Sequence, residues 1–344
     1  MNVILSKYTK EMRTAVLRAP RMQPMRLRML STSKDKVVVT CSINGVLTDP
    51  TKFSVPVTPE EMAVSCKEAH DAGAAVAHIH FRDQREGRGH FPTWDPNVAS
   101  DIATAIRERV PGMLLNFTTG TMGDGRKHPE NTFMNAMGGG ELGPIDGPIS
   151  CLDGATTQPE MAALNSGSLN YLRTTKDNKW AWEPLMFENR VEKITQMVDA
   201  MRLRKIVPEC ECFDTGIVRS IRMYEDVGML QAPYNVSLVM GVASGMPCDP
   251  RWVPLLAEEV NPRSQWQVIA IGRTEVWDTL RAGAELGGNV RTGLEDTFYL
   301  PNGNRATSNG QLIEALVQIC REVGREPAST EETRELIGWN DLNL

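Results

Sequence analysis

The chain lacks the surplus of positive charge that nucleic-acid binding requires. Its 344 residues hold 37 Lys and Arg against 43 Asp and Glu, a net charge of −6, and the pI is about 5.6. A surface that binds phosphate backbones needs clustered excess Lys and Arg, so the composition argues against nucleic acid as a partner. No run approaches the eighteen or so apolar residues of a membrane helix, and the mean hydropathy is −0.29. We expect a soluble protein with no membrane partner.

The spacing of the cysteines suggests no pairing. The seven cysteines are an odd number, none stands in a CxxC pair, and a chain of this length does not need disulfides for stability. No P-loop is present, and no GxGxxG turn follows the first predicted strand. These absences predict a reducing, cytoplasmic location and argue against the nucleotide-binding folds that carry those fingerprints.

The first 36 residues differ in composition from the rest. Nine of them are Lys or Arg, and only Glu11 and Asp35 are acidic. We divide the chain into a basic N-terminal extension, residues 1–36, which is disordered or a targeting segment, and one domain, residues 37–344. An Arg-rich, acid-poor leader resembles a transit peptide, which would place the protein in the mitochondrial matrix. A solvated arm or an upstream start codon would give the same composition.

From Lys36 onward, short β-branched or apolar runs alternate with longer helical patterns, which indicates a parallel sheet wrapped by helices. Eight such runs match a (β/α)8 TIM barrel better than an open doubly wound sheet of the Rossmann type, which usually has fewer strands and remains the alternative. The predicted strands are 37–43, 74–82, 113–119, 161–166, 207–214, 235–240, 267–272 and 289–295.

Helical patterns fall between most of these runs. Thr58 and Glu61 have the spacing of a capping box, in which each side chain accepts a hydrogen bond from the backbone of the other residue. The long connection from Gly120 to Glu160 is rich in Gly and Pro and is interpreted as a functional lid or as an excursion that packs on a neighbouring subunit. The other predicted helices are 96–109, 189–204, 216–226, 251–259, 275–284 and 308–323.

His78 and His80 are the sharpest local signal in the sequence. In a strand the two imidazoles share one face, about 6.5 to 7 Å apart along the chain, and metal–nitrogen bonds of about 2.0 to 2.1 Å let one ion bind both. A pair of hydrogen-bonded core histidines is the alternative. Because barrel enzymes place their chemistry at the carboxyl ends of the strands, and polar Arg82 and Asp83 follow at once, the position favours a metal site.

Charged residues close the last predicted strand. Arg291, Gly293 and Glu295 share one of its faces, and Asp296 stands where the strand ends. In a closed barrel the eighth strand neighbours the first, so a single strand would separate Glu295 from the two histidines. We therefore expect a third metal ligand here, although either carboxylate could instead cap a following helix.

A second carboxylate pair, Glu209 and Glu211, alternates onto one face of the fifth predicted strand and leaves Cys210 and Cys212 on the other. Buried carboxylates need a cation or hydrogen-bond donors, and Arg291 is a suitable partner for Glu211. A purely structural ion pair inside the barrel is the alternative.

Polar turns close the third and fourth predicted strands. They read Thr118-Thr119-Gly120-Thr121 and Leu164-Asn165-Ser166-Gly167. Their hydroxyls, amides and backbone N–H groups could hold a substrate carboxylate, but Gly, Ser and Asn are also ordinary turn formers.

Taken in order, these segments resemble the β-keto acid cleavage enzymes, the family that includes the 3-keto-5-aminohexanoate cleavage enzyme of lysine fermentation. The resemblance covers the chain from about Val37 to the C-terminus. The segments that carry it are Pro56-Val57-Thr58-Pro59-Glu60-Glu61, Ala72-Gly73-Ala74, His78-Ile79-His80-Phe81-Arg82-Asp83, Met161 to Gly167, Pro208-Glu209-Cys210-Glu211, Gly241-Val242, Gly245-Met246, Ile271-Gly272-Arg273, Gly293-Leu294-Glu295-Asp296, Ser308-Asn309 and Gln311-Leu312.

The resemblance implies one zinc ion per subunit, bound by His78, His80 and Glu295, in a barrel that assembles as a homotetramer. It also implies the reaction: a β-keto acid and acetyl-CoA give acetoacetate and a new acyl-CoA. A divalent ion suits this chemistry because it lowers the cost of enolate charge on the β-keto oxygen. Coenzyme A itself leaves no fingerprint in the sequence.

By the same resemblance, Asp296 would be the catalytic base, assisted by Arg291 and Glu211. Beside the metal and Arg291, Asp296 is expected to stay ionised and able to accept the α-proton.

The substrate carboxylate would lie against Thr118, Thr121 and Asn165. Two departures from the family pattern are present: Leu47 stands where the aminohexanoate enzyme has a glutamate for the substrate amine, and Ala163 stands where it has a threonine. Because desolvating an ammonium beside Leu47 would be costly, we predict an uncharged or apolar β-keto acid that lacks the 5-amino group.

Two other functions fit parts of the sequence. Two histidines and one carboxylate also describe the site of a mononuclear iron oxygenase or another metallo-barrel enzyme. The second alternative function is that of a catalytically silent barrel, which binds a keto acid or acyl-CoA without turnover. The presence of Arg291 and Asp296 beside the predicted metal site argues against this alternative.

Overall fold

The computed structural model describes residues 35–122, 132–153 and 158–342, and its centre is a closed barrel of eight parallel strands. Around the barrel the strands follow the order β10-β11-β2-β3-β4-β5-β8-β9, and β9 pairs with β10. The (β/α)8 prediction is confirmed, and the open-sheet alternative is wrong. Each barrel strand overlaps one predicted run: β2 (Val39–Ser42), β3 (Val76–Ile79), β4 (Leu114–Phe117), β5 (Met161–Asn165), β8 (Val207–Cys212), β9 (Asn235–Met240), β10 (Gln265–Ala270) and β11 (Asn289–Thr292).

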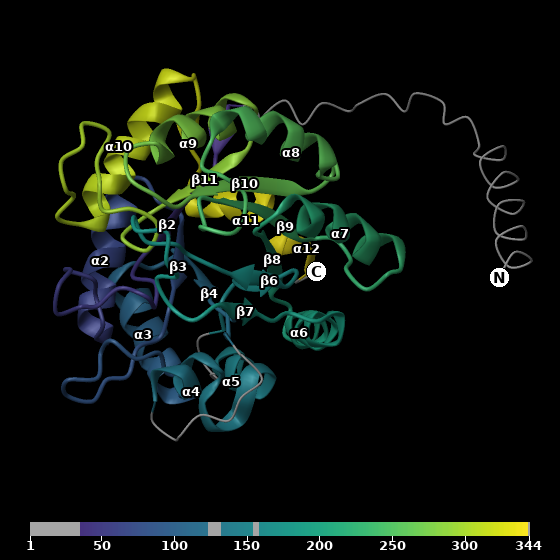
Figure 1. Ribbon diagram of the computed structural model, residues 1–344. Coiled ribbons are helices and arrows are strands. Elements are labelled where there is room, and N and C mark those ends of the chain that lie inside the picture. Colours follow the sequence, from purple (N-terminus) through teal and green to yellow (C-terminus); the bar gives the residue numbers. More distant parts are fainter. Residues whose placement is uncertain (1–34, 123–131, 154–157, 343–344) are drawn as a thin grey trace, which may run out of the picture. The chain divides into compact units, whose positions relative to one another are not determined.

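Helices surround the barrel on its outside (Figure 1). All the predicted helices are present, and the one expected at 251–259 is divided into a 3-10 turn and an α-helix. Their bounds are α2 (Pro59–Asp71), α3 (Pro96–Arg109), α6 (Val191–Leu203), α7 (Thr215–Asp226), η3 (Pro250–Trp252), α8 (Val253–Glu259), α9 (Val276–Glu285) and α10 (Asn309–Glu322).

Side-chain caps fix where several of these helices begin. The Thr58 hydroxyl accepts from the Glu61 N–H at 3.3 Å, and the Glu61 carboxylate accepts from the Thr58 N–H at 3.0 Å, so the predicted capping box is confirmed. The Asp95 side chain caps α3 by accepting from the Asn97 N–H, and the Ser308 side chain caps α10 by accepting from the Gln311 N–H. Each cap satisfies a backbone N–H that the first helical turn leaves without a partner.

The long connection after β4 is partly helical rather than one loop. It contains α4 (Phe133–Met137), η2 (Gly140–Leu142) and α5 (Gly143–Leu152), and α5 packs between α3 and α6 as the third outer helix. Gly139 has φ +97°, and a Cβ there would lie 1.9 Å from the Gly143 carbonyl oxygen, so only glycine permits this close turn. Residues 123–131 and 154–157 of the connection lie outside the described residues.

The amino-terminal ends of the barrel strands are covered by the last part of the chain. There β1 (Lys36–Val37) pairs with β12 (Glu326–Pro327), and α11 (Thr330–Leu336) and α12 (Trp339–Leu342) follow. A small apolar cluster fills this end and leaves the opposite end for the site; its buried members are Val38, Val76, Leu114, Met161, Val207, Ala328 and Ile337. Of the predicted extension 1–36, residues 1–34 lie outside the described residues.

Beyond β5 the chain forms an antiparallel hairpin that the sequence did not predict. Its strands are β6 (Leu169–Tyr171) and β7 (Leu185–Phe187), paired from Leu169 opposite Phe187 to Tyr171 opposite Leu185. The Ser244 hydroxyl, on the segment after β9, accepts from the Leu172 N–H at 3.1 Å and donates to the Asn170 carbonyl. The hairpin is thus fastened to the carboxyl-terminal side of the barrel.

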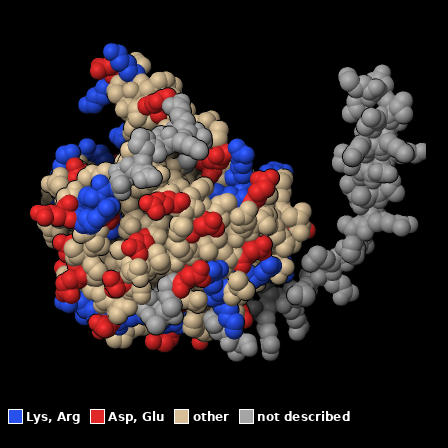
Figure 2. Space-filling view, turned by 90° about the horizontal axis from the view of Figure 1, so that it is seen from below, with Lys and Arg blue, Asp and Glu red and all other residues tan. Residues whose placement is uncertain are grey.

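The surface carries charges of both signs. Acidic and basic side chains are interspersed on the face drawn in Figure 2. Within the part of the chain that the structure describes, no helix is long and apolar enough to cross a membrane. All seven cysteines are free, and Cys210 and Cys212 pack outward into the core beneath the helices, as their alternation with Glu209 and Glu211 predicted.

Candidate active site

The carboxyl ends of the barrel strands surround a cavity of about 450 Å³, called here the mouth cavity. Most of its wall is apolar. The acidic and basic side chains that line it are His78, His80, Arg173, Glu211, Arg291 and Glu295. The predicted metal ligands therefore lie on the wall of one cavity, at the end of the barrel where the fold places catalytic residues.

His78, His80 and Glu295 form a compact group, called here the metal cluster. Their nearest ligand atoms lie 3.2 Å apart for His78 Nε2 and His80 Nε2, 3.2 Å for His80 Nε2 and Glu295 Oε1, and 3.6 Å for His78 Nε2 and Glu295 Oε2. Tetrahedral zinc with bonds of about 2.0 to 2.1 Å has ligand atoms about 3.3 to 3.4 Å apart. The three side chains therefore have the spacing to bind one metal ion.

Two buried atoms of the metal cluster have no hydrogen-bond partner in the described structure, His78 Nδ1 and Glu295 Oε2. Burial, Arg291 and His80 together hold the pKa of His78 well below its usual range. Burial alone would raise the pKa of Glu295, but Arg291 and the two histidines outweigh it and hold that pKa well below its usual range. A neutral imidazole and an ionised carboxylate are the protonation states that bind metals.

Arg291 joins the metal cluster to the other predicted catalytic residues. Its Nη2 lies 3.0 Å from Glu295 Oε1 and 3.0 Å from Asp296 Oδ1, and its Nη1 lies 3.3 Å from Glu211 Oε1. The Asp296 carboxylate also accepts from Arg291 Nε at 3.1 Å and from the Ser42 hydroxyl at 2.6 Å. The predicted Arg291–Glu211 contact is present, and one guanidinium contacts three carboxylates.

The two carboxylates beside Arg291 differ in access and in proton affinity. Glu211 lines the mouth cavity, and burial and the Glu209 charge raise its pKa to about 8. The Asp296 side chain is fully buried behind Arg291 and does not line the cavity; burial raises its pKa to about 6 against the opposing effect of Arg291. Glu211 therefore holds its proton more tightly than Asp296 does.

Glu209 lies deeper in the barrel than Glu211 and makes no ion pair in the described structure. Its carboxylate accepts from the Ser237 hydroxyl at 2.6 Å, from Gln267 Nε2 at 2.5 Å and from the Asn116 amide. Neutral donors thus satisfy this buried charge, and Glu209 serves as a structural anchor beneath the site.

The polar turns after β4 and β5 meet at the cavity wall. Thr118, Gly120 and Asn165 line it. Thr121 does not: its side chain is completely buried, donates to the Pro144 carbonyl at 3.1 Å and accepts from Lys193 Nζ at 2.8 Å. Of the three residues predicted to hold the substrate carboxylate, two face the cavity and Thr121 supports the turn from behind.

Lys193 is a residue that sequence reasoning missed. Besides Thr121, its ammonium donates to Asn189 Oδ1 at 2.9 Å and to the Glu188 carbonyl at 3.2 Å. Burial lowers its pKa to about 8, which Glu188 partly opposes. A lysine within a helical pattern gives no sign in the sequence that it lies behind a substrate-binding turn.

The loop after β2 approaches the metal cluster closely. Gly45 has φ +55°, and a Cβ there would lie 2.7 Å from Glu295 Cγ, so a side chain would displace the ligand. The buried Arg82 guanidinium fixes this loop by donating to the carbonyls of Asn44, Gly45 and Thr48. Leu47 lies on this loop and lines the mouth cavity.

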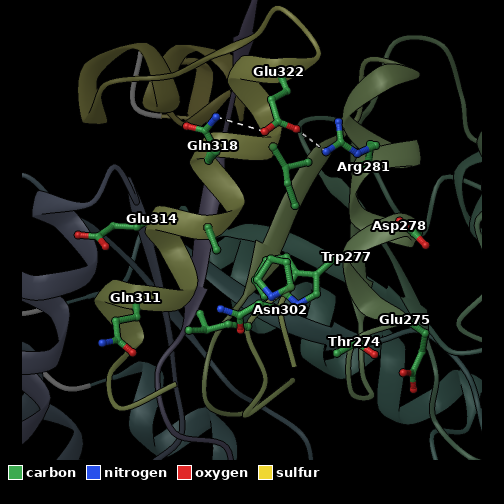
Figure 3. A pocket seen from close by; sticks show the side chains of 14 residues that line it. Thr274, Glu275, Trp277, Asp278, Arg281, Asn302, Gln311, Glu314, Gln318 and Glu322 are labelled. Atoms are coloured by element: carbon green, nitrogen blue, oxygen red, sulfur yellow. Dashed lines mark hydrogen bonds and ion pairs between the residues drawn. The ribbon is translucent and has the colours of Figure 1, made fainter. Parts of the chain in front are cut away.

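A larger groove of about 940 Å³ lies elsewhere, between α9 and α10 on the outside of the barrel (Figure 3). Its wall carries the side chains of polar helical residues, and Glu322 there accepts from Arg281 and Gln318. It is open, and neither histidine nor cysteine lines it. The groups that could bind a metal or activate a substrate are in the mouth cavity, which we take as the candidate active site.

Comparison with known families gives a match that covers most of the chain. The family described as "beta-keto acid cleavage enzyme" matches residues 36–339. This range includes the metal cluster, the Arg291 contacts and the polar turns, and it begins just after the basic N-terminal segment.

Two curated relatives cover most of the chain. The 3-keto-5-aminohexanoate cleavage enzyme of Acetoanaerobium sticklandii is 30% identical over 88% of this chain and 98% of its own length. The 3-dehydrocarnitine:acetyl-CoA trimethylamine transferase of Rhizobium meliloti is 30% identical over 87% of this chain and 95% of its own length. Equal identity to proteins named for different keto acids does not choose between those substrates.

Among solved structures, the apo structure of ObcA superposes with a TM-score of 0.61 at 19% identity, over 83% of this chain. This chain spans 65% of the length of that one. The likeness supports the barrel fold.

Proposed function

The chain belongs to the β-keto acid cleavage enzyme family, and from that premise we propose that it is a zinc-dependent acyltransferase that condenses a β-keto acid with acetyl-CoA. The bond between the α-carbon and the β-keto carbon breaks, the acyl fragment passes to the sulfur of coenzyme A, and the acetyl group takes its place on the α-carbon. The products are acetoacetate and a new acyl-CoA.

In this proposal His78, His80 and Glu295 hold the metal ion. Their spacing, the ligand-competent protonation states and the unpartnered Glu295 Oε2 support it. When bound, a divalent ion supplies a Lewis acid that lowers the cost of negative charge on the β-keto oxygen.

Asp296 and Glu211 would divide the proton transfers between them. With pKa values of about 6 and about 8, Asp296 gives up its proton more readily than Glu211, so Asp296 suits the role of base toward the α-proton and Glu211 suits the role of donor. Arg291 bonds to both carboxylates and would carry charge compensation between them. Because Asp296 lies behind Arg291, the guanidinium must shift when substrate binds before Asp296 can act as a base. Catalytic hydrogen bonds often reach their working geometry only in the substrate complex.

The substrate carboxylate would bind at the polar turns. Thr118 and Asn165 are the candidate side chains on the cavity wall, and the Gly120 backbone lies between them. Thr121 would act from behind by holding Lys193, whose ammonium adds positive potential to the turn.

The rest of the substrate would be apolar. Leu47, Met122, Leu169 and Phe213 contribute to the cavity wall, and both cavity carboxylates, Glu211 and Glu295, already contact Arg291. A substrate ammonium would have no free anion among the described lining residues, and an unpaired buried charge is costly. This supports a β-keto acid without the 5-amino group.

The observation that carries the proposal is the convergence of two imidazoles and one carboxylate, within 4.8 Å of one another, on the cavity wall. The test is turnover of a panel of β-keto acids with acetyl-CoA, combined with metal analysis of protein purified without added metal. We expect zinc and acetoacetate formation. Iron with oxygen-dependent turnover would favour an oxygenase instead, and ligand binding without turnover would favour a silent binding barrel.

Two predictions from the sequence concern assembly and location. The first is a homotetramer, and the second is the cytoplasm, or the mitochondrial matrix if residues 1–36 are a transit peptide. Size-exclusion chromatography with light scattering would decide the assembly, and imaging of the tagged full-length chain would decide the compartment.

A further inference from the structure

Arg173 is the cation of the mouth cavity that has no carboxylate partner among the residues the structure describes. Arg291, the other arginine on the wall, contacts Glu211, Glu295 and Asp296. Arg173 is exposed, and its guanidinium carbon lies 5.9 Å from the centre of the Trp182 ring. It is therefore available to an anion that enters the cavity.

The hairpin holds Arg173 in place. The Arg173 carbonyl accepts from the Ala181 N–H at 2.8 Å, and the Trp182 indole donates to the Tyr171 carbonyl at 3.3 Å. These bonds join the two sides of the hairpin, and the two Ser244 contacts fasten its β6 side to the segment after β9. An arginine held by its backbone loses less freedom on binding than one on a mobile loop.

An aromatic surface runs beside this arginine. The Tyr171 and Trp182 rings stack with centres 5.5 Å apart and planes inclined by 14°, and both line the cavity. The segment between β6 and β7 also carries Lys176 and Lys179. The hairpin therefore has three basic and two acidic residues, whereas the chain as a whole has a net charge of −6. The hairpin thus places a cationic side chain and a flat aromatic wall on the same cavity that the metal cluster lines.

We propose that Arg173 binds the phosphate-bearing end of acetyl-CoA, and that Tyr171 and Trp182 form the wall along which its pantetheine arm reaches the metal cluster. The inference rests on the proposed function, in which acetyl-CoA is a co-substrate. That substrate carries several phosphates at the end remote from the reacting thioester, whereas the proposed keto acid is apolar at its far end. A planar guanidinium bonds phosphate oxygens in pairs, which a lysine cannot match.

The test compares Arg173→Gln with wild type and with Lys179→Gln, a matched control that removes one positive charge from the same hairpin but lies outside the cavity wall. We expect Arg173→Gln to raise the Kd of coenzyme A, measured by calorimetry, and the KM of acetyl-CoA by about tenfold or more, since a charge-assisted bond is lost. The KM of the keto acid, the kcat and the Tm should change little. Lys179→Gln should change the affinity for coenzyme A less than threefold, as a screened surface charge does.

Acetyl-pantetheine, which has no 3′-phosphate or diphosphate, separates the possible causes. Wild type and Arg173→Gln should use it equally well, because the variant loses only phosphate contacts. The proposal is overturned by an equal penalty with acetyl-pantetheine, by a rise in the KM of the keto acid instead of acetyl-CoA, by an equal loss in Lys179→Gln, or by absence of coenzyme A binding in wild type. Coenzyme A binding that depends on Arg173 without turnover of any keto acid would support this site and refute the proposed function.

Discussion

Replacement of Glu295 by Gln removes the only carboxylate of the metal cluster while keeping the shape of the side chain. The substitution removes one charge from the cluster and the Glu295–Arg291 ion pair at 3.0 Å. Arg291 keeps Asp296 at 3.0 Å and Glu211 at 3.3 Å, so its charge stays compensated and the barrel should fold. The expected change in Tm is therefore small, and the effect should appear in metal binding.

The expected loss of metal affinity in Glu295→Gln follows from the position of the Glu295 carboxylate among the metal ligands. Residues that merely orient metal ligands account for about 10- to 100-fold in metal affinity, so loss of a ligand should cost at least about 100-fold, or about 2.7 kcal/mol. Loss of the ion would also remove several kcal/mol of charge stabilisation from the reaction, which is a drop in kcat/KM of about a thousandfold or more.

The assay is metal content of protein purified without added metal, metal titration of chelator-treated protein, and acetoacetate formation. Glu160→Gln is a matched control because Glu160 is also buried and paired with arginine, but it lies at the amino-terminal end of β5. The control should keep its metal. If Glu295→Gln retained one tightly bound ion per subunit and most of its activity, the assignment of the third ligand would be wrong.

Four further changes test the rest of the site. Asp296→Asn and Glu211→Gln should each lower kcat by about 100-fold or more with metal content unchanged; unchanged kcat in either variant would remove that residue from the proton transfers. Leu47→Glu should raise kcat/KM for amino-substituted β-keto acids relative to unsubstituted ones about tenfold, measured on the substrate panel. An unchanged ratio would show that Leu47 does not contact the substrate tail. Because Lys193 is charged below its pKa of about 8 and neutral above it, the KM of the keto acid should rise in wild type as the pH passes through 8. Glu211 titrates in the same pH range, so the pH profile of KM is compared between wild type and Lys193→Arg, whose side chain stays charged. If the two profiles coincide, the Lys193 ammonium has no role in binding the keto acid.

Strand and helix positions could be predicted because they depend on local signals. Eight apolar runs, and caps such as Thr58 with Glu61, needed only periodicity and side chains a few residues apart. His78 and His80 could be recognised for the same reason, since alternation along one strand puts their imidazoles on one face. The connection after β4 was interpreted as a loop, because its glycine-rich composition is typical of loops. The helices within it pack only once Gly139 and Gly143 approach each other.

The sequence alone determined the fold class, the strand that carries the two histidines, and a pairing of Arg291 with a carboxylate. Only the tertiary structure decided that Glu295 contacts those histidines across β2, that Asp296 lies behind Arg291 while Glu211 faces the cavity, and that Thr121 and Lys193 support the polar turn from outside it. The hairpin that carries Arg173 was likewise decided there. The physical reason is that periodicity and capping act over a few residues, whereas which charge reaches solvent and which is buried depends on barrel closure, which brings together residues more than 200 positions apart.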